Sequence, residues 1–214
     1  MNKRLEEYIP VAEVIAKTFG HDCEVVLHDL SVPQNSVVYT INNHVTGRAV
    51  GQSFNHLITE VLLSQNFTND HAANYYFHTD DGRLIKSSTL LIRDEEKKVI
   101  GALCINVDTT KITQSIEWLR SLIPDYSNHP AEPEHASKSI DDMEHIQEIA
   151  HDLIDKIVGD KDPGKLRRDE KIEMIRFMEE KGIFLIRGTI DRVAEKLKVS
   201  KVTVYSYIEE IRKR

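Results

Sequence analysis

Three strand-like runs follow one another between residues 74 and 108, and this stretch constrains the fold more than any other. The first two runs, 74–79 and 83–93, are separated by Asp-Asp-Gly, and Asp-Gly between such runs is a strong signal for a β-hairpin. A run of charged residues separates the second from the third run, VIGALCINVD at 99–108. The sequence therefore predicts an antiparallel meander of three strands.

The residues around the meander have the periodicities of both helices and strands. Apolar residues recur at helical spacing before Gly20, which is a natural helix stop. The expected elements are helices at 3–19, 54–65 and 111–123 and strands at 23–30 and 36–41. Together with the meander they predict an α+β domain of five strands with helices on one side of the sheet.

A polar segment with three prolines, residues 124–138, divides the chain and is expected to be a linker. It separates a first domain, 1–123, from a helix at 139–163 and a second domain at 164–214. The 139–163 helix carries apolar residues in steps of three and four: Met143, Ile146, Ala150, Leu153 and Ile157. Such a seam fits either a two-stranded contact between two copies of the chain or packing onto its own domain.

The last 26 residues have the pattern of two short helices with a tight turn between them. Ile190, Val193, Ala194 and Leu197 share one helical face, and Ser200 is a good N-cap for a second helix. The second helix repeats the pattern with Val204, Tyr207, Ile208 and Ile211. This is the pattern of a helix-turn-helix, in which the second helix enters the major groove of DNA. The alternative is an ordinary helical hairpin within a core.

Charge favours the DNA-binding alternative. Residues 165–214 hold 14 Lys and Arg against 9 Asp and Glu, whereas the whole chain holds 28 against 35. A basic C-terminal module on an acidic body suits binding to a phosphate backbone. A solvated charged surface would explain mixed signs, but it explains this asymmetry poorly.

The geometry of the helix-turn-helix assigns candidate DNA contacts. The outward face of the second helix should meet base edges, and residues beside it should meet phosphates. The candidates for base edges are Lys201, Val202, Tyr205 and Ser206, and those for phosphate are Arg187, Arg192, Ser200 and Thr203. For each of them, plain surface polarity is the alternative.

Stretches along nearly the whole chain resemble the YheO-like family of transcriptional regulators. The matching stretches are CEVVLHDL (23–30), HVTGRAVGQS (44–53), LIKSSTLLIRD (84–94), VIGALCINVD (99–108) and KGIFLIRGTIDRVAEKLKVSKVTVYSYI (181–208). The resemblance implies a PAS-like sensor domain followed by an all-α helix-turn-helix domain, in a cytoplasmic regulator related to D-arginine utilisation repressors. One departure is Lys198, which occupies a turn position where many helix-turn-helix units have glycine.

A second set of candidates lies in and beside the strands of the first domain. A ligand pocket needs a few convergent polar groups within an apolar lining, and Arg48 could pair bidentately with a ligand carboxylate. The candidates for a small polar ligand such as an amino acid are His28, Thr46, Gly47, Arg48, Ser87, Thr89 and Asn106. The alternative is a hydrogen-bond network that only stabilises the fold.

Catalytic and metal sites are not indicated. His145, Glu148 and His151 have helical spacing, but they are expected on the solvent side, and the chain has no HExxH or CxxC motif. It also lacks a nucleophile elbow and a Gly-rich phosphate loop. We therefore expect no catalytic residue, metal or cofactor.

Composition agrees with a cytoplasmic protein. Cys23 and Cys104, the two cysteines, lie in strand-like runs and are expected to be buried free thiols, as in a reducing compartment. The first residues lack the apolar core of a signal peptide, and we expect no membrane contact.

Three hypotheses remain open from the sequence. The first is a dimeric DNA-binding regulator whose PAS-like domain senses a small ligand or partner. The second is a PAS-like module that binds no ligand and only mediates dimer or partner contacts. The third, a metal-assisted enzyme with a regulatory tail, is the least supported.

Overall fold

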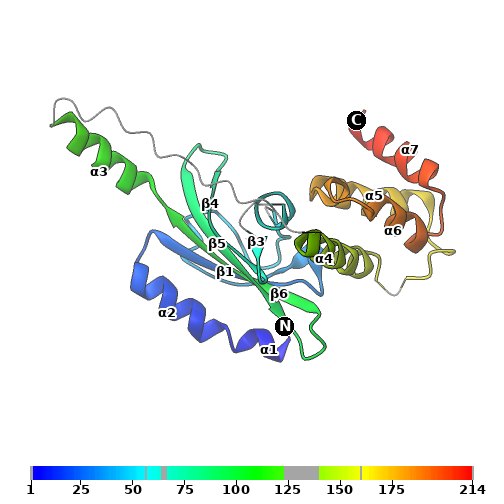
Figure 1. Ribbon diagram of the computed structural model, residues 1–214, viewed down its shortest axis with the longest axis horizontal. Coiled ribbons are helices and arrows are strands. Elements are labelled where there is room, and N and C mark those ends of the chain that lie inside the picture. Colours follow the sequence, from blue (N-terminus) through cyan, green and yellow to red (C-terminus); the bar gives the residue numbers. More distant parts are fainter. Residues whose placement is uncertain (1, 56, 64–66, 123–139, 160, 214) are drawn as a thin grey trace.

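The computed structural model describes residues 2–55, 57–63, 67–122, 140–159 and 161–213. It confirms the α+β class, with an antiparallel sheet and helices followed by an all-α C-terminal part (Figure 1). The predicted linker, 124–138, lies outside the described residues. Within the described residues, no helix is both long enough and apolar enough to cross a membrane.

The sheet has six strands, in the order β2-β1-β6-β5-β4-β3. Five of them are the predicted ones, and all neighbours are antiparallel. The sixth, β3, has two residues, which is too short for any periodicity to show in the sequence. The strands are β1 Cys23–Asp29, β2 Val37–Ile41, β3 Phe67–Thr68, β4 His71–His78, β5 Leu84–Arg93 and β6 Val99–Asp108.

The Asp-Asp-Gly turn forms the expected hairpin between β4 and β5. His78 pairs with Leu84 in the register, and the Thr79 amide donates to the Arg83 carbonyl at 3.0 Å. Gly82 has a φ of +83°, a left-handed conformation that glycine adopts without a steric cost. The turn therefore fixes which side chains of β4 and β5 share a face.

Helical elements cover both faces of the sheet, so the expectation of helices on one side only was wrong. α1 (Lys3–Glu6) and α2 (Ile9–Phe19) pack on one face, and a π-helix, η2 (Leu57–Leu62), packs on the other (Figure 1). All seven residues of β1 are buried, which requires cover on both faces. The remaining elements of this part are η1 (Pro33–Asn35) and α3 (Thr110–Ser121).

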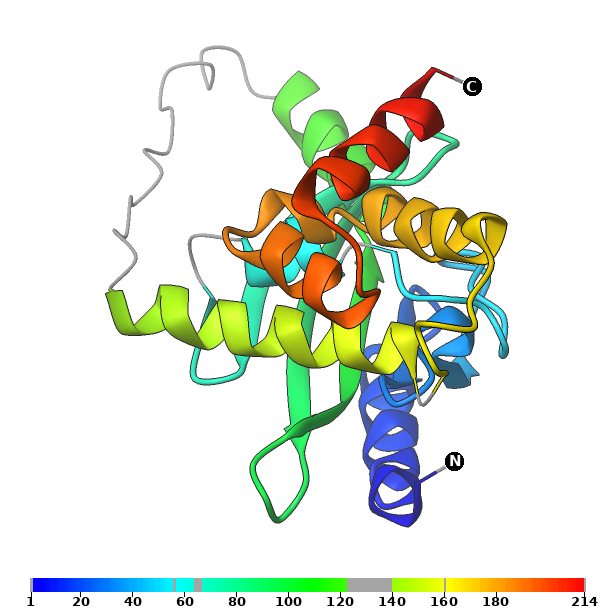
Figure 2. The ribbon, with the colours of Figure 1, turned by 90° about the vertical axis from the view of Figure 1, so that its right-hand side faces the viewer.

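α4 (Ile140–Val158) lies across the same face as η2 and carries the C-terminal helices on its far side (Figure 2). These are α5 Arg168–Glu180, η3 Ile183–Leu185, α6 Thr189–Lys196 and α7 Lys201–Arg212. Ile146, Ala150, Leu153 and Ile157 of the predicted seam are buried in the chain's own core; the side chain of Met143 lies outside the described residues. The seam therefore packs within the chain, one of the two alternatives that the sequence left open.

One apolar cluster runs from the sheet through α4 into the C-terminal helices. It contains Leu91 and Ala102 from the sheet, Ile154 from α4 and Val193 from α6. A core shared in this way couples the two parts energetically, because removing atoms from α4 weakens the packing on both sides.

Ile154→Ala is expected to lower the free energy of unfolding by about 2–5 kcal/mol, because Ile154 is fully buried and the substitution leaves a cavity. Urea unfolding followed by circular dichroism would measure this effect. Val50→Ala, at a side chain 65% exposed, is the control and should change the stability by less than about 0.5 kcal/mol. Two separate transitions, of which Ile154→Ala moves only one, would contradict a shared core.

Candidate DNA-binding surface and ligand cavity

The two C-terminal helices α6 and α7 pack as a helix-turn-helix. Most of the apolar stripe predicted from the spacing is buried: Val193, Leu197 and Val204 are fully covered, and Ala194 and Ile208 are nearly so. Ile190, Tyr207 and Ile211 are half-buried against the same core. α6 also contacts α4, and α7 contacts α5, so the pair packs onto the rest of the protein through its inner side.

The turn between α6 and α7 contains Lys198, whose backbone conformation is unusual for a lysine. Lys198 has a φ of +49°, the left-handed conformation that favours glycine. Ser200 then caps α7 as predicted, since its hydroxyl accepts from the Thr203 amide at 3.1 Å. The lysine is therefore accommodated in the tight turn with backbone strain, and α7 begins where the sequence indicates.

The first turns of α7 present an uncovered face. Lys201, Val202, Tyr205 and Ser206 are all exposed, and Val202 and Tyr205 are 77% and 56% exposed. An exposed valine and tyrosine on one face suit apolar contact with a thymine methyl and contact with base edges. Lys201 and Tyr205 also border a hollow of about 330 Å³ together with Arg187. The structure thus brings three of the predicted DNA contacts to one place.

The other predicted DNA contacts differ in how far their side chains are buried or already bonded within the protein. Arg192 is half-buried, and its Nε donates to Asp155 of α4 at 3.0 Å; a phosphate would have to replace that contact. Thr203 is half-buried beside the cap. Lys201 forms an exposed ion pair with Asp191, which contributes little in water and is readily exchanged.

The sheet register brings polar candidates of the first domain onto one face. Asn106 of β6 pairs with Glu24 of β1 on one side and with Ser87 of β5 on the other. Two residues along, Thr89 pairs with Cys104 on the same face, because alternate residues of a strand point the same way. This face lies beneath η2 and the loop that contains Arg48.

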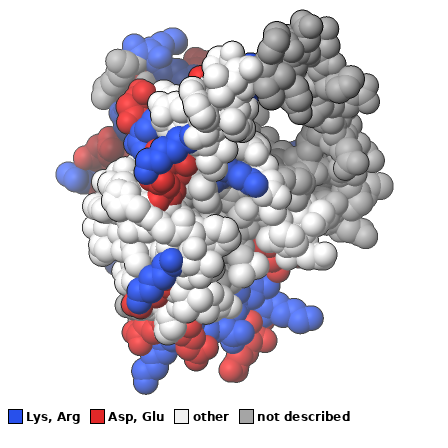
Figure 3. Space-filling model, turned by 90° about the vertical axis from the view of Figure 1, so that its left-hand side faces the viewer, with Lys and Arg blue, Asp and Glu red and all other residues white. Residues whose placement is uncertain are grey.

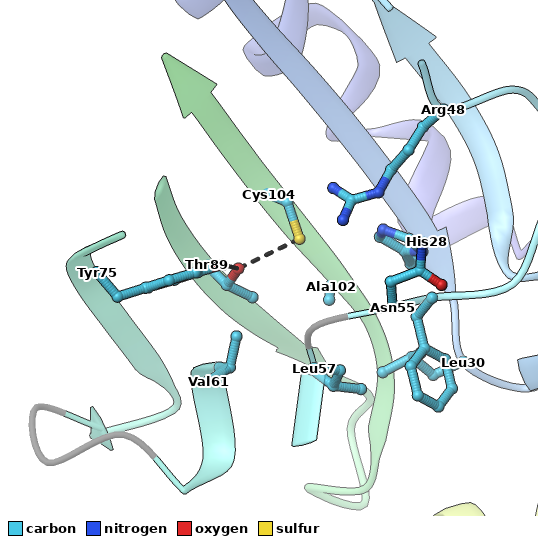
Figure 4. A pocket seen from close by; sticks show the side chains of 11 residues that line it. His28, Leu30, Arg48, Asn55, Leu57, Val61, Tyr75, Thr89, Ala102 and Cys104 are labelled. Carbon is cyan, nitrogen blue, oxygen red and sulfur yellow. Dashed lines mark hydrogen bonds between the residues drawn. The ribbon is translucent and has the colours of Figure 1, made fainter. Parts of the chain in front are cut away.

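Arg48 is the charged group at the centre of this region. Only 8% of its surface is exposed, and its guanidinium points towards Cys104 and His28 (Figure 4). Its Nε has no hydrogen-bond partner among the described residues, and its guanidinium carbon lies 6.0 Å from the centre of the Phe77 ring. The charge of Arg48 acts against burial on the pKa of Glu24, but no ion pair of Arg48 is formed among the described residues. A buried guanidinium without a paired anion is costly, so the site favours an anionic partner.

A cavity next to Arg48 is lined by mixed apolar and polar side chains. Its lining includes three of the predicted ligand residues, His28, Arg48 and Thr89. Sequence analysis missed Phe54, Asn55, Tyr75 and Cys104; Tyr75 and Cys104 lie in strand-like runs and resemble ordinary core residues. The other lining residues are Leu30, Leu57, Val61 and Ala102. The cavity measures about 20 Å³, room for about one water molecule.

Thr46, Ser87 and Asn106 form a network beside the cavity rather than its wall. The Glu24 carboxylate accepts from Thr46 at 2.6 Å and from Asn106 at 2.7 Å, and Asn106 accepts from the Ser87 hydroxyl at 2.7 Å. Burial raises the pKa of Glu24, and its Oε1 has no partner among the described residues. Sequence analysis missed Glu24, although a glutamate inside the run CEVVLHDL was a signal for it.

Gly47 and His28 complete the predicted set. Gly47 has a φ of +75°, so its role is to turn the chain into Arg48. His28 is buried, its Nδ1 lies 3.0 Å from the Ser36 hydroxyl, and burial together with the charge of Arg48 lowers its pKa to about 3. His28 is therefore a neutral member of the cavity wall at physiological pH.

Comparison with known proteins gives the family. The model of the YheO-like PAS domain matches residues 1–124, and that of an HTH domain matches residues 146–209. The chain belongs to the YheO-like PAS family. The family assigned from sequence resemblance is confirmed.

Relatives of this YheO-like PAS protein match over nearly its full length. The uncharacterized protein YheO of Escherichia coli (strain K12) is 29% identical over 209 residues, which are 97% of this chain and 85% of that protein. The transcriptional regulator DauR of Pseudomonas aeruginosa is 27% identical over 209 residues, which are 97% of this chain and 94% of that protein.

Solved structures resemble it more distantly. The PAS domain of a protein from Colwellia psychrerythraea is 22% identical with a TM-score of 0.34, covering 47% of this chain and 98% of that one. A Vibrio cholera VqmA–ligand–DNA complex is 14% identical with a TM-score of 0.28, covering 94% of this chain and 80% of that one.

In this YheO-like PAS protein the cavity wall touches the DNA-binding domain directly. The rings of Phe54 and Phe177 of α5 meet edge to face at 6.2 Å, and Lys181, just after α5, donates to the Asn55 side chain at 3.0 Å. Lys181 also lies over both rings, at 5.9 and 5.5 Å. A shift of Phe54 or Asn55 would therefore be felt by α5 without any intermediate group.

The histidines of α4 are not on its solvent side, contrary to expectation. His145 and His151 are half-buried, and His145 Nε2 lies 2.8 Å from Asp70 and 3.0 Å from Arg93. These contacts tie α4 to the end of the sheet. Among the described residues, no group of three His, Cys, Asp or Glu side chains could hold a metal ion.

Replacing His28 with glutamine is expected to flatten the loss of stability at acid pH. The fold keeps His28 neutral down to about pH 3, whereas the unfolded chain takes up the proton near pH 6.5, so wild-type stability falls as the pH falls through this window. Below pH 6.5 the wild type should lose about 1.4 kcal/mol more per pH unit than His28→Gln.

Denaturant unfolding between pH 4.5 and 7.5 would compare the two slopes. His71→Gln, at an exposed histidine, is the matched control and should keep the wild-type slope. Parallel slopes for wild type and His28→Gln would contradict a buried neutral His28.

Proposed function

We propose that this YheO-like PAS protein is a transcriptional regulator that binds operator DNA as a homodimer in the cytoplasm. The observation that carries the proposal is the uncovered face at the start of α7, where Lys201, Val202 and Tyr205 are exposed while the opposite side of the helix is buried. Residues at the N-terminal end of a recognition helix are the ones that reach base edges. The charge of the last fifty residues, 14 bases against 9 acids, supports contact with phosphate.

Lys201→Ala and Tyr205→Ala are each expected to weaken specific binding by about 1–3 kcal/mol, which is the worth of a base contact. Fluorescence anisotropy would measure binding to a duplex from the region upstream of its own gene and to a random duplex of equal length. The loss should be larger on the specific duplex, because base contacts carry the discrimination.

Lys213→Ala is the matched control for charge. Lys213 lies at the other end of α7, about 18 Å along the helix axis from Lys201, and pairs with Glu209. Its removal should leave the discrimination between the two duplexes unchanged. Equal binding of wild type to both duplexes at moderate salt would overturn the assignment.

The cavity of the PAS domain is the proposed sensor, and Arg48 defines its ligand as a small molecule with a carboxylate. The support is a nearly buried guanidinium whose Nε lacks a partner, beside polar Thr89 and neutral His28. Guanidinium and carboxylate match bidentately. His28, Thr46, Gly47, Ser87 and Asn106 would shape and stiffen this site. An amino acid is one ligand of this class.

Entry of such a ligand would act on α5 through the cavity wall. At about 20 Å³ the cavity is too small for more than a water molecule, so a ligand must displace a wall residue. Phe54 and Asn55 are wall residues that contact Phe177 and Lys181. A ligand that binds the displaced state better would thereby shift the balance between two positions of the DNA-binding domain.

A panel of small molecules at millimolar concentration would test the sensor by thermal unfolding. Free amino acids and short carboxylic acids are expected to stabilise the wild type, by about 2.7 kcal/mol at a concentration of 100 Kd. The corresponding amides should not stabilise it, and Arg48→Gln should remove the effect. Equal stabilisation by acids and amides would contradict a role for Arg48.

The small cavity favours a second candidate, a PAS module that binds no ligand and serves dimer or partner contacts. In that case Arg48 only supports the fold, over the Phe77 ring. No member of the panel would then stabilise the wild type, and Arg48→Gln would lower its stability without any effect on ligand response.

A further inference from the structure

α3 is a helix without a buried side chain. Every residue from 111 to 122 is exposed, and the helix projects away from the body of the protein (Figure 1). An isolated helix of twelve residues is only marginally stable in water. Packing of its exposed apolar side against a partner would therefore stabilise it.

The exposed residues of α3 are apolar along one broad side. Ile112, Ile116 and Leu119 follow helical spacing, and Trp118 and Leu122 extend the same side; each is 42–63% exposed. At 100° per residue, Glu117 lies on the opposite side of the helix. Arg120 borders Ile116, and Lys111 lies at the edge of the apolar side formed by Trp118 and Leu122. This is the pattern of a helix that packs against a partner.

α2 also has an exposed apolar side. Its inner side packs on the sheet through Ala12 and Ala16, while Val11, Val14 and Phe19 remain 45%, 64% and 69% exposed. Asp22, three residues after the end of α2, pairs with Lys111 at the start of α3, with Nζ at 2.7 and 2.8 Å from the carboxylate oxygens. Figure 3 shows this side of the molecule, where broad uncharged areas are bordered by charged side chains.

We propose that the outer sides of α2 and α3 form the contact between two copies of this chain. Each of the eight exposed apolar residues presents roughly 100 Å², so one protomer offers about 800 Å², the amount that each partner contributes to a stable protein interface. The α4 seam is not free to serve instead, because Ile146, Leu153 and Ile157 are already buried within the chain.

The charges of α2 and α3 also favour a second copy of this chain as the partner. α2 carries Glu13 and Lys17, and α3 carries Glu117, Arg120 and Lys111, of which Lys111 is already paired with Asp22. Such mixed signs can complement themselves across a two-fold axis. A membrane surface would select a basic polar side instead. A dimer also fits the two half-sites of an operator, which is the one part of the argument that rests on the proposed function.

The test uses the full chain without DNA. Sedimentation velocity at tens of micromolar should give the mass of a dimer, and dilution should dissociate it. Trp118 is the one tryptophan of the sequence, so its emission should move to longer wavelength as the dimer dissociates and the indole becomes exposed to water. The double substitution Ile116→Glu with Leu119→Glu should weaken the dimer by about 30-fold or more.

Val50→Glu is the matched control, because Val50 is 65% exposed and lies outside α2 and α3; it should leave the mass unchanged. Circular dichroism of the double variant should show a folded protein, since α3 buries no side chain in the chain itself. The proposal would be overturned by a monomeric wild type or by a double variant that still dimerises. It would also be overturned if the emission wavelength of Trp118 did not change on dilution. Lys201→Ala should remain dimeric, so failure of DNA binding and failure of the dimer are distinguishable.

Discussion

The packing of α4 between the sheet and the C-terminal helices is the interaction on which the rest of the structure depends. Ile154 is fully buried, and it belongs to one cluster with Ala102 of the sheet and Val193 of α6. The contact of His145 with Asp70 fixes the same helix at its other end. Because interiors are close-packed, such a helix cannot shift without repacking both neighbours.

This arrangement gives the cavity beside Arg48 and the exposed face of α7 a short physical connection. Phe54 lies in the cavity wall and against Phe177, and α5 in turn packs on α7. Coupling between two sites requires a structural element whose equilibrium both sites bias. In this protein that element would be the docked position of α5, rather than a rearrangement of the α4 seam between protomers.

The buried polar groups of the sheet beside the cavity are only partly satisfied. Glu24, Asn106 and Ser87 are hydrogen-bonded across three strands, but Glu24 Oε1 and Arg48 Nε have no hydrogen-bond partner among the described residues. A satisfied network rigidifies a core, and an unpaired charge destabilises it. Arg48 is thus one of two incompletely satisfied buried groups in this region, and it is the one that a carboxylate would complement.

The sequence by itself determined the local elements and the family. The Asp-Asp-Gly turn, the cap at Ser200 and the apolar stripe through Val204 depend on nearest neighbours along the chain, and the structure confirms them. Only the tertiary structure decided which side chains contact one another across the fold. Glu24 pairs with Asn106, 82 residues away, and Arg192 is engaged by Asp155 of another helix. The sequence pattern also could not distinguish an α4 seam that binds a second copy of the chain from one that is buried within its own chain. Both uses require the same apolar spacing.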